Sequence, residues 1–332
     1  MPVNSDTTER PPRPPKKRTP GSRLDPRMLA DLARSGLTRR DAEAMQLRFW
    51  SASETKKNLN IDLPSYVIPY RLIDGSITTK VARLRLLGSE KEIIAATGDD
   101  RRYRAIIGGN AFYLAPLPSG MLSWKDISRD VSVPIGFVEG EKKSFSAVSR
   151  ANQYIIGISG VWNWLGSASP PKVIDGGIPE DKKHKDRLSK KNYTKLLDEF
   201  SLFEWKGRIV FVIFDWPDIK RKAGVIEALT RFVATLSKLG ANVRIVELGT
   251  DINGPDIKLD DFIRDNGPEA FVKLLERAEP LTTDGLTRLR EGYIKIMKPP
   301  NTFYSRDTRE LMRARDFHGA TLHLVTRDDE GR

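Results

Sequence analysis

The chain contains 332 residues, of which 39% are hydrophobic and 30% charged, and this length allows two domains with buried cores. It has no cysteine and only three histidines, which excludes disulfides and cysteine-ligated zinc and argues against zinc held by histidine. The amino-terminal segment is polar and proline-rich, and no apolar run approaches the roughly 20 residues that span a bilayer. We therefore expect a cytoplasmic protein with no membrane contact.

Residues 1–27 form a basic tail rich in proline and arginine, within a chain whose formal net charge is +12. A tail of this composition buries too little apolar surface to fold alone, so we predict that it is disordered. The overall charge favours a polyanionic partner, most often nucleic acid. The tail either adds diffuse attraction to phosphates or is an inert extension, and its composition fits both.

Residues 28–130 are predicted to form a small α+β module, which is a candidate for nucleic-acid binding. Apolar spacing indicates two helices between Pro26 and Phe49, with a break at Ser35-Gly36 and a second helix that starts after Thr38 and continues through Phe49. Asp74-Gly75 lies between two β-prone runs and predicts a hairpin. Further strands are expected near residues 102–107 and 111–114.

Residues 131–280 alternate between short apolar runs and helix-prone segments. This alternation is typical of an α/β domain in which parallel strands are joined by right-handed helical crossovers. A polar, lysine-rich insertion at 167–195 interrupts it, and residues 281–332 are expected to form a helical appendage or a tether. The four expected strands are Ile135–Glu139, Tyr154–Ile158, Ile209–Phe214 and Asn242–Leu248.

The first of these strands ends in Glu139 and is followed by Gly140 and a helix-prone segment. In open α/β sheets the carboxyl ends of the strands form the ligand site, and glycine allows the tight turn that such a site needs. Lys142 and Lys143 lie in the first turn of the expected helix, where they can hold a phosphate together with the helix amino terminus. The alternative is a charged surface turn.

Acidic residues also follow the third strand, at Asp215 and Asp218, and the fourth, at Asp260 and Asp261. A helix cap explains each aspartate separately, but it explains their occurrence together with Glu139 less well. Carboxylates buried at strand ends need a compensating cation, and oxygen ligands suit Mg²⁺ or Mn²⁺. We predict that Glu139 and these four aspartates hold such an ion.

Two further groups are candidates for contact with nucleic acid. The basic cluster Lys220, Arg221 and Lys222 follows the acids of the third strand, where it could hold phosphates. Trp162 and Trp164 lie in a loop after the second strand and could stack on bases, although tryptophans more often pack in the core. The sequence contains no GxxxxGK[ST] motif, so it encodes no P-loop motor.

Three features, taken in chain order, resemble the TOPRIM domain. They are a strand ending in Glu-Gly at 139–140, a strand ending in Asp215, and a later Lys-Leu-Asp-Asp at 258–261. The TOPRIM domain is the catalytic fold of DnaG-type primases, type IA and II topoisomerases and some nucleases. The resemblance is closer to TOPRIM primase-like proteins of phages, plasmids and mobile elements, a branch described as domains of unknown function. It extends over about residues 28–280, and its most specific strings are Glu139-Gly-Glu-Lys-Lys143 and Gly160-Val-Trp-Asn-Trp164.

The resemblance implies a TOPRIM-like Rossmannoid parallel sheet flanked by helices. It also implies that Glu139 acts as a metal ligand or general acid–base, and that Asp215 and one of the two aspartates at 260–261 hold Mg²⁺ or Mn²⁺. The chain departs from the family in having Pro217 where the usual Asp-x-Asp motif has its second acid, a place that Asp218 could take one residue later. It also lacks the cysteines of the zinc-binding module that such primases often carry.

Our leading hypothesis is a primase-type nucleotidyltransferase that binds single-stranded DNA and joins ribonucleotides, with a replicative helicase or polymerase acting in trans. A TOPRIM nuclease would use the same acids to activate water. A non-catalytic DNA-binding accessory protein is the third possibility, and Pro217 favours it. Catalysis requires the three acidic segments to meet around a cation, whereas a basic side chain that fills the space between them would leave only a polyanion binder.

Overall fold

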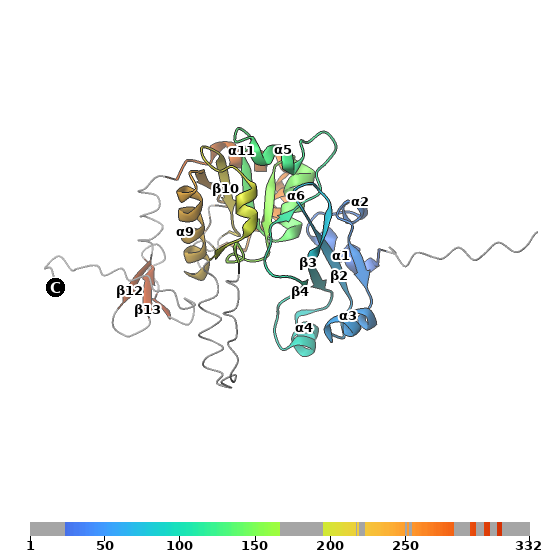
Figure 1. The fold of residues 1–332 in the computed structure, drawn as a ribbon. Coiled ribbons are helices and arrows are strands. Elements are labelled where there is room, and N and C mark those ends of the chain that lie inside the picture. Colours follow the sequence, from blue (N-terminus) through green and yellow to red (C-terminus); the bar gives the residue numbers. More distant parts are fainter. Residues whose placement is uncertain are drawn as a thin grey trace, which may run out of the picture.

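A five-stranded sheet lies at the centre of the fold (Figure 1). The computed structural model describes residues 24–166, 195–216, 218, 223–249, 251, 254–281, 293–296, 302–305 and 311–313. Four strands run parallel in the order β11-β10-β6-β7, and the short β5 pairs antiparallel with β7. The predicted α/β fold with a mostly parallel sheet is therefore confirmed. The strands are β5 (Tyr113–Leu114), β6 (Ile135–Glu139), β7 (Ile155–Ile158), β10 (Ile209–Ile213) and β11 (Asn242–Ile245).

The parallel strands are apolar because helices cover both faces of the sheet. The crossovers from β6 to β7 and from β10 to β11 run in opposite directions along the sheet, so right-handed connections place α6 (Glu141–Ala151) and α9 (Ala223–Lys238) on opposite faces (Figure 1). α10 (Leu259–Asn266) and α11 (Pro268–Arg277) pack against α6. On the α9 face, Phe137 lies at the centre of an aromatic cluster that also contains Phe112, Phe200, Trp205 and Phe232.

β7 lies very close to the start of α6. A Cβ atom on Gly157 would be 3.0 Å from the carbonyl oxygen of Gly140 and 3.2 Å from Cβ of Ser144. Gly140 itself has a φ of +102°, which side chains rarely tolerate, and its amide donates a hydrogen bond to the carbonyl of Ile158 at 2.6 Å. The turn that follows Glu139 is therefore held in place by the neighbouring strand.

A four-stranded antiparallel sheet with the order β1-β2-β3-β4 precedes the central sheet. β2 and β3 form the predicted hairpin, with Gly75 at a φ of +85° in its turn. The second predicted helix is wrong beyond Ala44, because Gln46 adopts a φ of +56° and residues 48–50 pair with β2 instead. The elements are α1 (Pro26–Arg34), α2 (Arg39–Ala44), β1 (Arg48–Trp50), α3 (Ala52–Leu59), β2 (Ser65–Arg71), β3 (Ile77–Leu86), α4 (Glu90–Thr97), β4 (Tyr103–Ile107) and α5 (Trp124–Arg129).

Capping boxes explain where four of these short helices begin. Thr38, Ser51, Ser89 and Ser123 each accept a hydrogen bond from the amide three residues later, and an acidic side chain at that position accepts one from the cap amide. Helices of this length are marginal alone, so packing against the core must support them. The main core cluster runs from Leu24 to Leu275 and joins both sheets.

The remaining elements bear on the predicted domain organisation. β8 (Leu165–Gly166) and β9 (Lys195–Leu196) pair across the two ends of the lysine-rich insertion, and a short 3₁₀ helix η1 (Asp198–Leu202) follows. Residues 1–23 of the predicted tail and 167–194 of the insertion lie outside the described residues. Where we expect a helical appendage or tether, the described residues form three antiparallel strands, β12 (Tyr293–Ile296), β13 (Thr302–Ser305) and β14 (Leu311–Arg313).

β5 falls in the predicted 28–130 module but belongs to the central sheet, and the boundary at residue 130 stays a prediction. Of the helices in the described ranges, none combines the length and apolar character needed to cross a bilayer.

Candidate functional site

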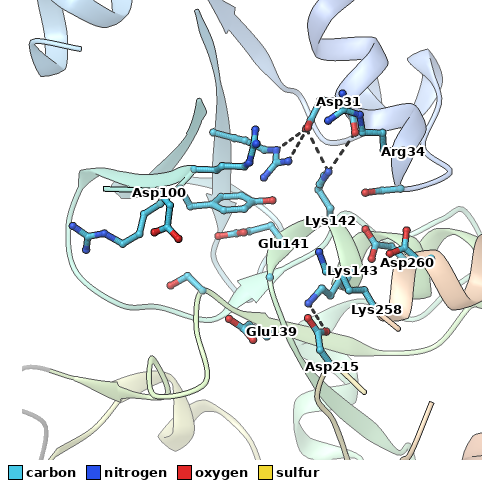
Figure 2. A pocket seen from close by; sticks show the side chains of 18 residues that line it. Asp31, Arg34, Asp100, Glu139, Glu141, Lys142, Lys143, Asp215, Lys258 and Asp260 are labelled. Atoms are coloured by element: carbon cyan, nitrogen blue, oxygen red, sulfur yellow. Dashed lines mark hydrogen bonds and ion pairs between the residues drawn. The ribbon is translucent and has the colours of Figure 1, made fainter. Parts of the chain in front are cut away.

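A pocket of about 740 Å³ lies at the carboxyl ends of β6 and β10 (Figure 2). Glu139 and Asp215 line it from these two strand ends, and the first turn of α10 contributes Asp260 and Asp261. The start of α6, the helix α1 and the loop at residues 100–103 complete the wall. The three acidic segments that are far apart in the sequence therefore meet at one edge of the sheet, as their positions after parallel strands predict.

The pocket contains as many positive as negative side chains. Seven basic and seven acidic residues line it, together with Ser35, Tyr103, Gly140 and Ser159. This local balance differs from the net charge of +12 of the whole chain, so the site is more than a basic patch. The basic residues are Arg34, Arg85, Arg101, Arg102, Lys142, Lys143 and Lys258, and the acidic ones are Asp31, Asp100, Glu139, Glu141, Asp215, Asp260 and Asp261.

A lysine occupies the centre of the acidic group. The ammonium of Lys143 donates a hydrogen bond to Oδ1 of Asp215 at 2.5 Å, and both side chains are 13% exposed. Burial acts to lower the pKa of Lys143, but the charges of Asp215, Glu139 and Asp260 together raise it above its ordinary value. The ammonium therefore lies where the fields of all three acidic segments converge.

Of the two aspartates in α10, Asp260 rather than Asp261 belongs to this group. Asp260 is 5% exposed, and its Oδ1 accepts no hydrogen bond from the described part of the chain. Asp261 instead forms an ion pair with Arg264 at 2.8 Å. The N-cap of α10 is Lys258, with no side-chain cap, so helix capping does not account for the buried carboxylate of Asp260.

The donor set fits a divalent cation in its chemistry but requires one rearrangement. Glu139, Asp215 and Asp260 offer carboxylate oxygens, which Mg²⁺ and Mn²⁺ prefer, and Oδ1 of Asp260 has no hydrogen-bond donor among the described residues. In the described residues, no group of three or more acids is close enough to hold a metal ion as the side chains stand. As the side chains stand, the ammonium of Lys143 lies against Asp215, where an ion bound by this carboxylate would have to displace it.

Other predicted site residues lie elsewhere. Asp218 is absent from the pocket lining, although its charge acts to raise the pKa of Asp215. Trp164 is 3% exposed and packs against Phe232 with ring centroids 5.1 Å apart, so it is a core residue and is not available for stacking on bases. Trp162 is half-buried, with the guanidinium of Arg231 5.5 Å from its ring centroid. The cluster Lys220, Arg221 and Lys222 lies outside the described residues.

Lys142 faces away from the acidic group, toward α1. Its side chain is 9% exposed, and its ammonium lies 3.4 Å from Oδ2 of Asp31. Asp31 also accepts hydrogen bonds from Tyr66 at 2.8 Å and from Arg85 at 2.6 and 2.7 Å. Burial first, and then the charge of Arg85, lowers the pKa of Lys142 to about 8. Lys142, which the sequence predicts to bind a phosphate, therefore forms part of a buried network between the two sheets.

Sequence reasoning missed several residues of the pocket wall, among them Asp31, Arg85 and Glu141. Glu141 is 1% exposed and accepts a hydrogen bond from the hydroxyl of Tyr70 at 2.5 Å. Two weak signals were available. Asp31 interrupts the apolar face of α1 between Met28 and Leu32, and Glu141 belongs to the specific string that starts at Glu139.

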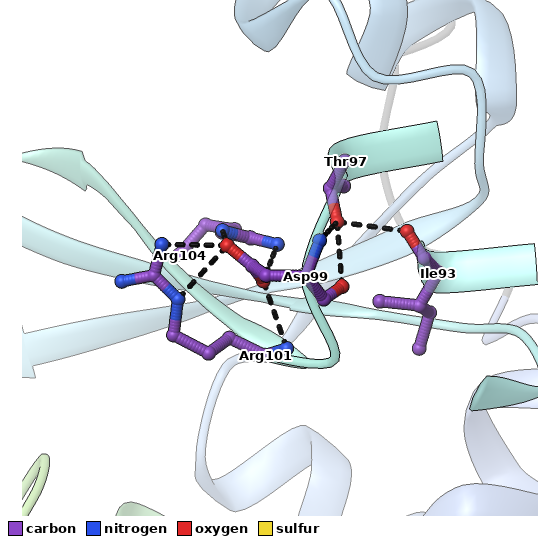
Figure 3. Close-up of polar contacts among 5 residues, drawn as sticks. All are labelled: Ile93, Thr97, Asp99, Arg101 and Arg104. Carbon is purple, nitrogen blue, oxygen red and sulfur yellow. Dashed lines mark hydrogen bonds and ion pairs between the residues drawn. The ribbon is translucent and has the colours of Figure 1, made fainter. Parts of the chain in front are cut away.

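The loop after α4 brings Asp100, Arg101 and Arg102 to the rim of the pocket. Asp99 fixes this loop, because its carboxylate accepts hydrogen bonds from Arg101 at 2.6 Å and from Arg104 at 2.6 Å (Figure 3). These two arginines hold the pKa of Asp99 well below its ordinary value. The rim is thus a pre-formed basic surface beside the acidic centre.

Comparison with known proteins gives one family match. The family described as a domain of unknown function (DUF3854) matches residues 123–270, the segment that contains the four parallel strands and all three acidic segments. No curated protein sequence matches the chain.

Several solved structures have a similar arrangement at low identity. The zinc-binding and RNA polymerase domains of the Aquifex aeolicus primase are 13% identical, with a TM-score of 0.45, and the match covers 81% of this chain and 61% of that one. A DnaG primase catalytic domain bound to single-stranded DNA is 16% identical, with a TM-score of 0.43 and coverages of 81% and 82%. The RNA polymerase domain of Mycobacterium tuberculosis DnaG, in complex with double-stranded DNA, is 13% identical, with a TM-score of 0.44 and coverages of 81% and 78%.

Proposed function

We propose that this chain is a primase-like nucleotidyltransferase that binds single-stranded DNA and joins ribonucleotides by metal-dependent phosphoryl transfer during replication of a mobile genetic element. One observation carries the proposal. Glu139, Asp215 and Asp260, from three separate segments, line one pocket together with basic side chains that suit phosphates. Acidic and basic side chains in one pocket can bind a cation and a polyanionic substrate together. A cluster of ion pairs that only stabilises the fold does not need to be open to such ligands.

Different residues of the pocket would have different roles in the proposed reaction. Asp215 and Asp260 would hold Mg²⁺ or Mn²⁺, which supplies charge neutralisation at the reacting phosphate when bound. Glu139, at the end of β6, is placed to share the ion or to accept the proton of an attacking 3′ hydroxyl. Arg101 and Arg102 on the rim and Lys258 at the start of α10 would orient the phosphates of the strand or the incoming nucleotide.

A non-catalytic nucleic-acid-binding protein is the second candidate, and the contact between Lys143 and Asp215 favours it. The ammonium already neutralises this carboxylate at 2.5 Å, so Asp215 has a counter-charge without a metal ion. Such a protein would use the basic rim to bind DNA for a partner helicase or polymerase. The two candidates differ in whether ribonucleotides are joined, and not in whether DNA is bound.

The decisive test incubates the full chain with a labelled single-stranded template, ribonucleotides and Mg²⁺ or Mn²⁺. We expect metal-dependent extension that falls by at least about 100-fold in Glu139→Gln, since loss of a proton-transfer or metal-binding carboxylate typically costs this much. DNA binding by Glu139→Gln should change by less than about twofold, because the rim is unaltered. Glu276→Gln, an exposed carboxylate in α11 outside the pocket, is the matched control and should behave as wild type.

Each other outcome has a definite meaning. Cleavage of the labelled strand without extension assigns the site to a nuclease and overturns the primase proposal. DNA binding with neither extension nor cleavage supports the accessory protein. Equal extension by wild type and Glu139→Gln would mean that the pocket is not the catalytic site.

A further inference from the structure

The ion pair between Lys143 and Asp215 occupies the space that the proposed function assigns to a cation. Lys143 extends from the first turn of α6, and Asp215 follows the end of β10. Figure 2 shows the ammonium of Lys143 directed at Asp215, and Glu139 and Asp260 line the same pocket. One positive charge therefore balances part of the charge of three carboxylates that are otherwise poorly solvated.

This arrangement has two electrostatic consequences. Without any counter-ion, three carboxylates from different segments would repel one another at the edge of the sheet, and burial would strengthen that repulsion. With the ammonium present, a divalent cation cannot enter the same space, because two positive centres would then share one set of ligands. The metal ion and the ammonium must therefore alternate.

A lysine displaced from Asp215 would need another negative charge as its partner. Asp31 is not available to it, because that carboxylate already accepts bonds from Tyr66, Arg85 and Lys142. Burial raises the pKa of Asp215, and the charges of Lys143 and Lys258 both oppose this, so a second ammonium already lies near this carboxylate. A phosphate of a bound strand or nucleotide would bring a negative charge into the pocket together with the substrate.

We propose that Lys143 is a resident counter-ion, which holds the three carboxylates together before metal binds and moves onto a substrate phosphate when a divalent cation takes its place. This inference rests on the proposed function in that it concerns the same metal site. It makes the binding of cation and of nucleic acid mutually favourable, since each removes a competitor of the other. It also explains how one pocket can contain equal numbers of acids and bases.

The test measures Mn²⁺ binding by the intact chain, from the electron paramagnetic resonance signal of unbound Mn²⁺. Lys143→Gln should bind Mn²⁺ at least about tenfold more tightly than wild type, because the competing charge is gone. Lys56→Gln is the matched control. It removes a lysine from an exposed pair with Asp62, whose side chains are 58% and 62% exposed, and should leave the affinity unchanged.

A second measurement uses the wild-type chain and a short single-stranded oligodeoxythymidylate. We expect the DNA to raise the Mn²⁺ affinity of wild type at least about threefold, after correction for Mn²⁺ bound by the DNA alone, and to raise that of Lys143→Gln much less. If Lys143→Gln does not fold, as judged by circular dichroism, the effect of DNA on the Mn²⁺ affinity of wild type decides whether Lys143 has the proposed role.

The outcomes separate this inference from the proposed function. Equal Mn²⁺ affinities for wild type and Lys143→Gln, or no effect of DNA on wild type, overturn the counter-ion role and leave a metal-dependent enzyme possible. Failure of every variant to bind Mn²⁺, with or without DNA, overturns the counter-ion role and the metal-dependent function together.

Discussion

Two consecutive lysines of α6 form buried pairs with aspartates, yet the two pairs have different surroundings. Lys142 contacts Asp31, whose carboxylate also accepts hydrogen bonds from Tyr66 and from two nitrogens of Arg85. Lys143 contacts Asp215, which opens onto the pocket and has Lys143 as its short-range partner at 2.5 Å. The first aspartate is saturated with donors, whereas within the described residues the second accepts a hydrogen bond from one flexible side chain. The comparison indicates that the first pair serves the fold and the second can be exchanged for a ligand.

The largest effect on stability is expected at the saturated aspartate. Asp31→Ala would leave Arg85 and Lys142 buried without their carboxylate, so the free energy of unfolding should fall by about 3–5 kcal/mol. Denaturant unfolding at pH 7 measures this. Asp62→Ala, which breaks only an exposed pair with Lys56, should cost less than about 1 kcal/mol.

A smaller effect is expected at the exchangeable aspartate. Asp215→Asn keeps an oxygen that can accept from Lys143, and the ammonium retains the charges of Glu139 and Asp260 nearby. We therefore expect a loss of about 1–2 kcal/mol in the same unfolding experiment. A loss as large as that of Asp31→Ala would show that the two pairs are equally structural and would remove the basis for distinguishing them.

The smallest effect concerns pH. The folded pKa of Lys142 is lowered from 10.5 to about 8, so between these values the unfolded chain binds more protons than the folded one. Stability contributed by this group therefore increases as the pH rises through that window, by at most about 1 kcal/mol between pH 8 and 9. Comparison of wild type with Lys142→Met over this range isolates the contribution, and NMR of ¹³C-labelled lysine should show Lys142 titrating near 8 and Lys143 above the ordinary range. Identical titration of the two lysines would contradict the distinction between them.

The parts of the molecule that the sequence predicts well are those governed by local periodicity and by strand direction. The strand Ile135–Glu139 is observed with the predicted bounds, and the convergence of Glu139, Asp215 and Asp260 follows because parallel strands end at the same edge. The hairpin at Asp74-Gly75 was equally predictable, because that dipeptide has few other uses between β-prone runs.

What could not be predicted depends on side-chain direction and long-range packing. Nothing in a string of two lysines indicates that Lys142 faces α1 while Lys143 faces Asp215, since this depends on how α6 is rotated against the sheet. The role of Asp31 requires knowing that Arg85, 54 residues later, lies beside it. The sequence could not show that β5 pairs with β7 in the central sheet, because a strand of two residues has too little pattern to indicate its partner.

The missing side chain at Gly157 sets the spacing on which this chemistry depends. Its nearest neighbour is a main-chain oxygen at Gly140, which cannot rotate aside as a side chain can. Even a methyl group there would push β7 away from the loop that leads into α6. This movement would also shift Glu139, Lys142 and Lys143. The alignment of the pocket therefore also depends on an uncharged position, because a Cβ atom there would require the main chain at Gly140 to shift by a few tenths of an ångström.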